Sequence, residues 1–177
     1  AFIDPRAFRI VVANPGTYLA PTRQADFPFG FGGLPDELGS EPALRAYLAQ
    51  PLTLYLGQED TIQDQHFEKA PAAMEQGASR IERGRRTFAL ARQLAAERGW
   101  PFHWKLVEVP GVGHDHEQML NHDKFAEALF GDNFIERFGK PFEGAGGVVV
   151  SAGLEGVLAL EFEQRANLGE HGGNLFF

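Results

Sequence analysis

The chain has no cysteine among its 177 residues. This absence excludes disulfide bonds, a thiol nucleophile and zinc sites built on cysteine. Long apolar runs are also missing, because no stretch approaches the roughly 18 apolar residues that a membrane-spanning helix needs. Positive charge is scarce, and the net charge of −8 argues against binding nucleic acid or an anionic membrane surface through bulk electrostatics.

What the chain does contain is enough for a globular domain. Hydrophobic residues make up 44% of the sequence, which is ordinary for a soluble domain of this length. A chain of this size can bury about 70% of the surface that its unfolded form exposes. The 16 phenylalanines indicate a bulky apolar core or an apolar cleft.

Helices and strands alternate along the first 130 residues. Short apolar runs predict strands over residues 8–13, 52–56 and 102–109. Ser79 and Glu82 form a capping box, and with Gly99 as a stop signal they predict a long helix over residues 80–98. Shorter helices are expected at 40–50 and 124–130, whereas 15–39, rich in proline and glycine, and the polar stretch 61–78 should be irregular. This order predicts an α/β fold with a parallel sheet.

Three strands are fewer than such a sheet normally has, since about five or six are usual. Either the last part of the chain completes the sheet, or part of the sheet lies outside this chain. Residues 131–177 are rich in glycine, with apolar runs at 148–150 and 157–162. We therefore divide the chain into a domain at 1–130 and an extension at 131–177, which we expect to be a hairpin or partly disordered.

Two predicted strands are followed by groups that can move a proton. Asp60 comes shortly after Gly57, and His114 comes directly after Gly113. Ligands bind at the carboxyl ends of strands in open α/β sheets, and a carboxylate that accepts from one imidazole nitrogen leaves the other free to act as a base. Asp60 and His114 are therefore the predicted catalytic acid and base. Possible substitutes for the acid are Glu59 and Asp64, and for the base His116 and His122.

Metal binding is an alternative use of the same region. His114, Asp115, His116, His122 and Asp123 lie within ten residues, and zinc accepts such ligands. Their spacing matches no zinc motif, and a solvated turn followed by a helix cap is the simpler explanation of His116 and His122. A second charged group, Arg80, Arg83, Arg85 and Arg86, is expected to be a solvated helix face.

Four segments carry a resemblance to a known family: residues 8–16, 54–61, 74–85 and 107–114. In this order they resemble the carboxyl-terminal half of an α/β-hydrolase, close to bacterial esterase and depolymerase-like members. The resemblance implies a partial α/β-hydrolase fold with a lid-like insertion at about 15–50. It also implies that Asp60 is the acid and His114 the base of a catalytic triad acting on a small-molecule or polymeric ester, without a cofactor.

The nucleophile is where the chain departs from this family. In the α/β-hydrolase family the nucleophilic serine lies in a Gly-x-Ser-x-Gly motif that precedes the acid and the base in the sequence. None of the three serines in this chain lies in that motif. Ser40 and Ser79 are expected to cap helices. Ser151 has half of the motif, but a valine two residues earlier would crowd the turn.

The resemblance therefore implies an amino-terminal segment or chain that supplies the serine, and this chain alone should be inactive. Two other interpretations stay open. One is a hydrolase-like binding module without catalysis, and the other is a metal-dependent enzyme that uses the histidines.

Overall fold

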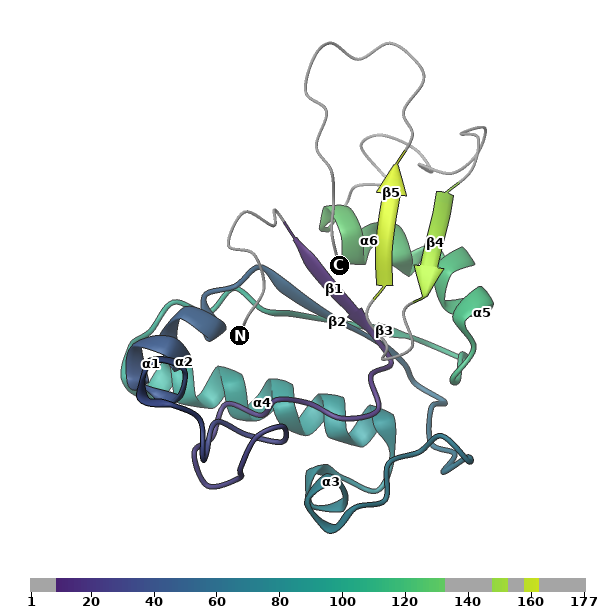
Figure 1. Cartoon of the computed structure of the whole chain (residues 1–177). Coiled ribbons are helices and arrows are strands. Elements are labelled where there is room, and N and C mark those ends of the chain that lie inside the picture. The colour runs from purple at the N-terminus through teal and green to yellow at the C-terminus, as the bar shows by residue number, and fades with distance from the viewer. Residues whose placement is uncertain (1–8, 133–147, 153–157, 163–177) are drawn as a thin grey trace, which may run out of the picture.

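A parallel three-stranded sheet organises the protein (Figure 1). The computed structural model describes residues 9–132, 148–152 and 158–162. Strands β1 (Ile10–Ala13), β2 (Leu52–Gly57) and β3 (Lys105–Val109) lie in the order β1-β2-β3. In the register, Leu54 lies opposite both Val12 and Leu106. The predicted α/β class and parallel sheet are confirmed.

Helices cover both faces of this sheet (Figure 1). Their bounds are α1 (Asp36–Gly39), α2 (Glu41–Leu48), α3 (Pro71–Gln76), α4 (Arg80–Arg98), α5 (His116–Asn121) and α6 (Lys124–Phe130). Helices α2 and α4 pack on one face, and α5 and α6 pack on the other. No helix in the described part of the chain is long and apolar enough to cross a membrane.

Strand β2 lies at the centre of the core, and all six of its residues are buried. Leu52, Leu54 and Leu56 pack in the cluster that includes α4, whereas Tyr55 packs in the cluster that includes α6. A strand covered on both faces is expected to be apolar throughout rather than alternating. This burial fixes the position of the end of β2, and Asp60 lies three residues beyond it.

Helix α4 begins and ends where the sequence predicts. The Ser79 hydroxyl accepts a hydrogen bond from the Glu82 N–H at 3.3 Å. The Glu82 carboxylate accepts from the N–H of Ala78 at 2.7 Å, one residue before the partner that a capping box would use. Gly99 ends the helix with φ of 63°, in the left-handed region.

Both segments predicted to be irregular contain a short helix, α1 in 15–39 and α3 in 61–78, and α5 is a further helix that the sequence does not predict. Helix α3 lies within 61–78, and its Pro71 occupies the first turn, where a missing N–H costs nothing. Helix α5 follows Asp115, whose carboxylate accepts from the N–H of Gln118 at 3.0 Å. Both helices have only 6 residues, too few to show a hydrophobic period in the sequence.

Two further strands, β4 (Val148–Ala152) and β5 (Leu158–Phe162), pair with each other in an antiparallel arrangement. They form a sheet separate from β1-β2-β3, and in their register Ser151 lies opposite Ala159. An antiparallel pair of strands agrees with one of the two expectations for this stretch, a hairpin; the residues between the two strands lie outside the described part. The division at residues 130 and 131 remains a prediction, because the other residues of 133–177 lie outside the described part.

Candidate active site

The carboxyl ends of the three parallel strands bring three polar side chains to one edge of the sheet. Asn14 follows β1, Asp60 follows β2 by three residues, and His114 follows β3 by five. Parallel strands point the same way, so loops that leave their carboxyl ends converge. Residues far apart in the chain therefore meet at this edge.

Asp60 and His114 are in direct contact, as their positions in the sequence predict. The His114 Nδ1 lies 2.8 Å from Asp60 Oδ2. The Asp60 side chain is 1% exposed, whereas the His114 side chain is 45% exposed. An ionised carboxylate can only accept, so Nδ1 is the donor in this contact, and in the neutral imidazole Nε2 then keeps its lone pair. This tautomer leaves a basic nitrogen on an imidazole ring that solvent can reach.

The loops that carry the pair are held against each other through their backbones. Glu59 N–H donates to the Val112 carbonyl at 2.9 Å, and Gln58 N–H donates to the Val109 carbonyl at 2.9 Å. A Cβ on Gly57 would lie 2.5 Å from the Val112 oxygen, too close for any side chain. Glycine at this position is therefore required for the two loops to approach each other.

Asn14 is a structural residue of the site that the sequence prediction missed. Its amide oxygen accepts from the Gly57 N–H at 2.7 Å, and its amide nitrogen donates to the Gly113 carbonyl at 3.0 Å. The side chain is buried and thereby ties the loop of the acid to the loop of the base. Its φ of 41° is a conformation that asparagine tolerates better than most residues. The segment Asn14-Pro15-Gly16 indicates a turn, and only the distant partners reveal this role.

We expect Asn14→Ala to lower the free energy of unfolding by about 2–3 kcal/mol. The substitution leaves the buried Gly57 N–H and the partly buried Gly113 carbonyl without their Asn14 partners and places alanine in the left-handed region. Urea denaturation measures the change. Asn121→Ala, at the exposed end of α5, is the control and should change stability by less than about 0.5 kcal/mol. An equal loss in both variants would contradict this role for Asn14.

The predicted solvated arginine face is wrong for two of its four members. Arg80 and Arg83 are 2% and 0% exposed, whereas Arg85 and Arg86 are exposed and pair with Glu108 and Glu82. The first turn of α4 lies against the loops after β2, where backbone carbonyls and carboxylates surround the two buried guanidinium groups. Sequence spacing alone does not show these partners.

Arg80 connects the acid of the pair to a second carboxylate. Its guanidinium nitrogens lie 3.0 and 3.2 Å from the two carboxylate oxygens of Asp64, and 3.5 Å from Asp60 Oδ1. It also donates to the carbonyl of Ile62 at 3.4 Å. The hydrogen bond from Arg80 lowers the pKa of Asp64 from 3.8 to about 2. Asp64 therefore pairs with Arg80 and does not replace Asp60 as the partner of His114.

The lowered pKa of Asp64 makes stability depend on acid. Because the folded state favours the carboxylate, this contribution is complete above about pH 4 and is lost as the pH falls toward about 2. In Arg80→Gln, we expect the pKa of Asp64 to rise toward its ordinary value, because the variant removes the largest cause of the lowering. Carbon NMR of the Asp64 carboxyl group measures this change, and an unchanged pKa would contradict the assigned cause.

The other candidate residues do not join the pair. Glu59 is exposed and uses its backbone in the contact between the loops. His116 begins α5, and His122 accepts from the Lys124 N–H at 3.1 Å. Among the residues that the structure describes, no three or more histidine, aspartate or glutamate side chains are grouped so that they could hold a metal ion.

Two of the three serines take the places that the sequence predicts. Ser40 caps α2 by accepting from the Ala43 N–H at 3.3 Å, as Ser79 caps α4. Ser151 lies inside strand β4 and not at a turn between a strand and a helix. None of these positions is the elbow that exposes a nucleophilic serine.

The segment predicted to form a lid packs beside α3. The Gln76 side chain accepts from the Tyr18 N–H at 3.0 Å and donates to the carbonyls of Tyr18 and Phe29. Phe31, 1% exposed, packs against Tyr47 and anchors the segment to the core, whereas Phe27 is 53% exposed. A covering role for residues 15–50 stays a prediction.

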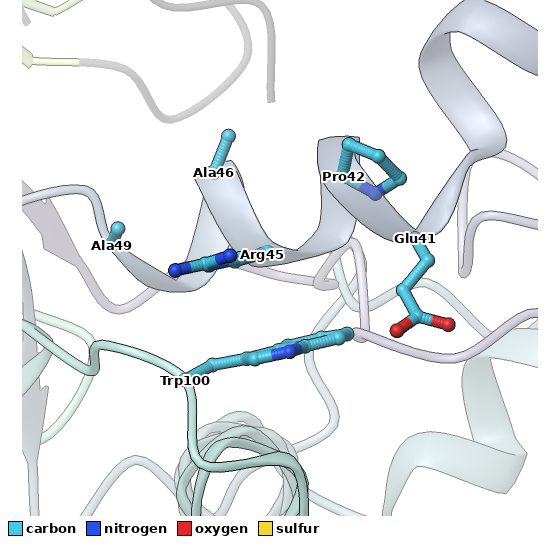
Figure 2. A pocket seen from close by; sticks show the side chains of 6 residues that line it. All are labelled: Glu41, Pro42, Arg45, Ala46, Ala49 and Trp100. Atoms are coloured by element: carbon cyan, nitrogen blue, oxygen red, sulfur yellow. The ribbon is translucent and has the colours of Figure 1, made fainter.

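A groove of about 400 Å³ lies near the opposite end of the sheet (Figure 2). Figure 2 shows the Trp100 indole ring below α2, with the Arg45 guanidinium above it and the Glu41 carboxylate at one end. Trp100 precedes β3, whereas the Asp60–His114 pair follows the carboxyl ends of β2 and β3. The groove is therefore separate from the pair.

Solved structures similar to this chain include those of two bacterial proteins. LpqC, a poly(3-hydroxybutyrate) depolymerase from Bordetella parapertussis, is 36% identical over 70% of this chain, with a TM-score of 0.60. Poly(aspartic acid) hydrolase-1 from Sphingomonas sp. KT-1 is 32% identical over 71% of it, with a TM-score of 0.59. No protein-family model and no curated protein sequence matches the chain. The matches span 41% and 46% of the two proteins, so the chain covers less than half the length of each.

Proposed function

Because the chain carries part of an α/β-hydrolase fold, we propose that it contributes the acid and base of a serine hydrolase. The bond cleaved is an ester or a related acyl bond. The contact of 2.8 Å between Asp60 and His114, from loops after two neighbouring strands, carries this proposal. We call these two residues the catalytic pair.

In this mechanism, His114 acts as the general base through Nε2. It takes the proton of a serine hydroxyl while the serine oxygen attacks the acyl carbon, and it then gives that proton to the leaving alcohol. Asp60 accepts the Nδ1 proton throughout, holds the ring in the required tautomer and stabilises the imidazolium that forms. A water molecule, deprotonated by His114, then attacks the acyl-enzyme, and the serine leaves and regains the proton from His114.

We infer that the serine belongs to an amino-terminal segment or chain. Two observations support this inference. Ser40 and Ser79 are engaged as helix caps, and Ser151 lies within a strand. We propose that the oxyanion hole and much of the substrate cleft come from the same segment. The groove at Trp100 and the cavity of about 260 Å³ between residues 20–29, α3 and α4 are both lined by residues other than the catalytic pair.

The substrate is proposed to be a small-molecule or polymeric ester. The two similar structures are named for the breakdown of polymers, one of poly(3-hydroxybutyrate) and one of poly(aspartic acid). These names favour a polymer for this protein too.

We expect the isolated chain to show no His114-dependent hydrolysis of p-nitrophenyl acetate. The reason is that the base has no serine to activate. Release of p-nitrophenol by the chain and by His114→Ala should be the same within error. Rapid turnover that is lost in Ser151→Ala would overturn the proposed source of the nucleophile.

A hydrolase-like binding module is the second candidate, favoured by the lack of a Gly-x-Ser-x-Gly serine in this sequence. This candidate also predicts that the isolated chain is inactive, but it predicts no reactive serine in the product of the whole gene. Labelling of that product with a fluorophosphonate therefore separates the two candidates.

A further inference from the structure

We propose that Asp64 tunes the catalytic pair by holding the charge of Arg80 away from Asp60. Asp64 and Arg80 are thus positioning residues that act through Asp60 on His114. This inference rests on the proposed function for its catalytic meaning, although the electrostatic effect itself can be measured without catalysis.

The guanidinium of Arg80 lies between two carboxylates and favours the one farther from His114. Its two terminal nitrogens reach the two Asp64 oxygens at 3.0 and 3.2 Å, the geometry of a bidentate pair. Asp60 Oδ1 lies at 3.5 Å from a single nitrogen, the limit of a hydrogen bond. The other oxygen of Asp60, Oδ2, contacts the imidazole at 2.8 Å, so the contact of Asp60 with His114 is closer than its contact with Arg80.

The Arg80 side chain is enclosed at this position. Its side chain is 3% exposed, and its guanidinium carbon lies 5.3 Å from the centre of the Phe67 ring. A buried guanidinium requires a negative partner, because an unpaired buried charge is costly. If Asp64 no longer carries a charge, Asp60 is the carboxylate within reach.

Asp64→Asn and Arg80→Gln should therefore shift the titration midpoint of the His114 ring in opposite directions. In Asp64→Asn, Arg80 pairs with Asp60 instead, and the Asp60 carboxylate then stabilises the His114 imidazolium less. Arg80→Gln removes the positive charge and leaves both carboxylates to stabilise the imidazolium. A purely structural role for the two residues would move His114 in the same direction in both variants.

Several other charged or titratable groups lie near the catalytic pair or near Arg80. When it is protonated, His114 contributes to lowering the pKa of Asp64. Arg83 lies beside Arg80 on the first turn of α4. On the side of the lid-like segment, burial and then the charge of Asp60 raise the pKa of Tyr18, so its hydroxyl stays neutral. The Asp115 carboxylate, next to His114 in sequence, caps α5 through Gln118. These groups are unchanged in both variants.

The test is proton NMR of the His114 ring in the chain itself. We expect the titration midpoint of the ring to fall by about 0.5–1 pH unit in Asp64→Asn and to rise by a similar amount in Arg80→Gln. Arg80→Lys, which keeps the charge, should lie close to the parent chain. Glu59→Gln, which removes an exposed carboxylate next to Asp60, should shift the midpoint by less than half as much because solvent screens that charge.

Shifts of the same sign in Asp64→Asn and Arg80→Gln would overturn the inference, as would a shift in Glu59→Gln equal to that in Asp64→Asn. If Arg80→Gln does not fold, Asp64→Asn decides alone, since Asp64 is 34% exposed and its amide is isosteric. No fall of the midpoint in that variant contradicts the inference. These readouts need no nucleophile, so the proposed hydrolase function can fail while the inference holds, or the reverse.

Discussion

Replacing Asp60 with asparagine should lower kcat for ester hydrolysis by about 10⁴-fold in the protein that contains the nucleophile. The Asp60 oxygen at 2.8 Å from Nδ1 is what keeps the proton on that nitrogen. An amide that donates to Nδ1 instead would place the proton on Nε2, where the base must be free. KM should change little, because Asp60 is buried behind the ring and does not reach the substrate. Steady-state kinetics with p-nitrophenyl esters of the protein expressed from the whole gene provides the measurement.

Glu59→Gln is the matched control for this prediction. Glu59 is the adjacent carboxylate in the sequence, but it is exposed and has no described hydrogen bond with His114. Its replacement should leave kcat within about twofold of the parent value. If Glu59→Gln were as damaging as Asp60→Asn, the acid would have been assigned to the wrong residue.

Arg83→Met should produce the largest loss of stability, about 3–5 kcal/mol. The Arg83 guanidinium donates to the backbone carbonyls of Gly77, Gly16 and Glu68 at 2.9, 2.6 and 2.8 Å. It also lies 4.0 Å from the centre of the Phe67 ring. Methionine keeps much of the apolar contact but leaves three carbonyls without their donor. Urea denaturation followed by circular dichroism measures the difference in the free energy of unfolding.

Arg86→Met provides the comparison on the same helix. The Arg86 side chain is 60% exposed, and its ion pair with Glu82 spans one turn of α4. Exposed pairs of this kind contribute about 0.3–0.5 kcal/mol, so the loss should be about tenfold smaller than for Arg83. Similar losses in the two variants would show that the contacts of Arg83 to the three loops contribute little.

The parts of the fold predicted from the sequence are those with strong local signals. Helix α4 carries a cap at Ser79, a stop at Gly99 and an apolar face between them, and its bounds are as predicted. The strands were predicted from short apolar runs, although β3 begins at Lys105, three residues later than expected. Helices α3 and α5 are not predicted from the sequence, because a helix of 6 residues has less than two turns in which to show a hydrophobic period.

The pairing of Asp60 with His114 could be predicted because topology alone brings the two strand ends to one edge. The groups that support the pair could not be predicted in this way. Asn14 holds the two loops through partners 43 and 99 residues away in the sequence. Arg80 and Arg83 sit in a run of arginines that has the composition of a solvated face, and only the packing of α4 against the loops buries them. Such roles depend on long-range contacts that no local pattern encodes.

The central claim is that His114 serves a serine that lies outside this chain. Its most direct test is labelling with a fluorophosphonate, followed by mass spectrometry, in this chain and in the product of the whole gene. We predict no label on Ser40, Ser79 or Ser151, and one label on a serine before Ala1 that is lost in His114→Ala. A label on Ser151, or a labelled serine whose reactivity does not depend on His114, would contradict the account.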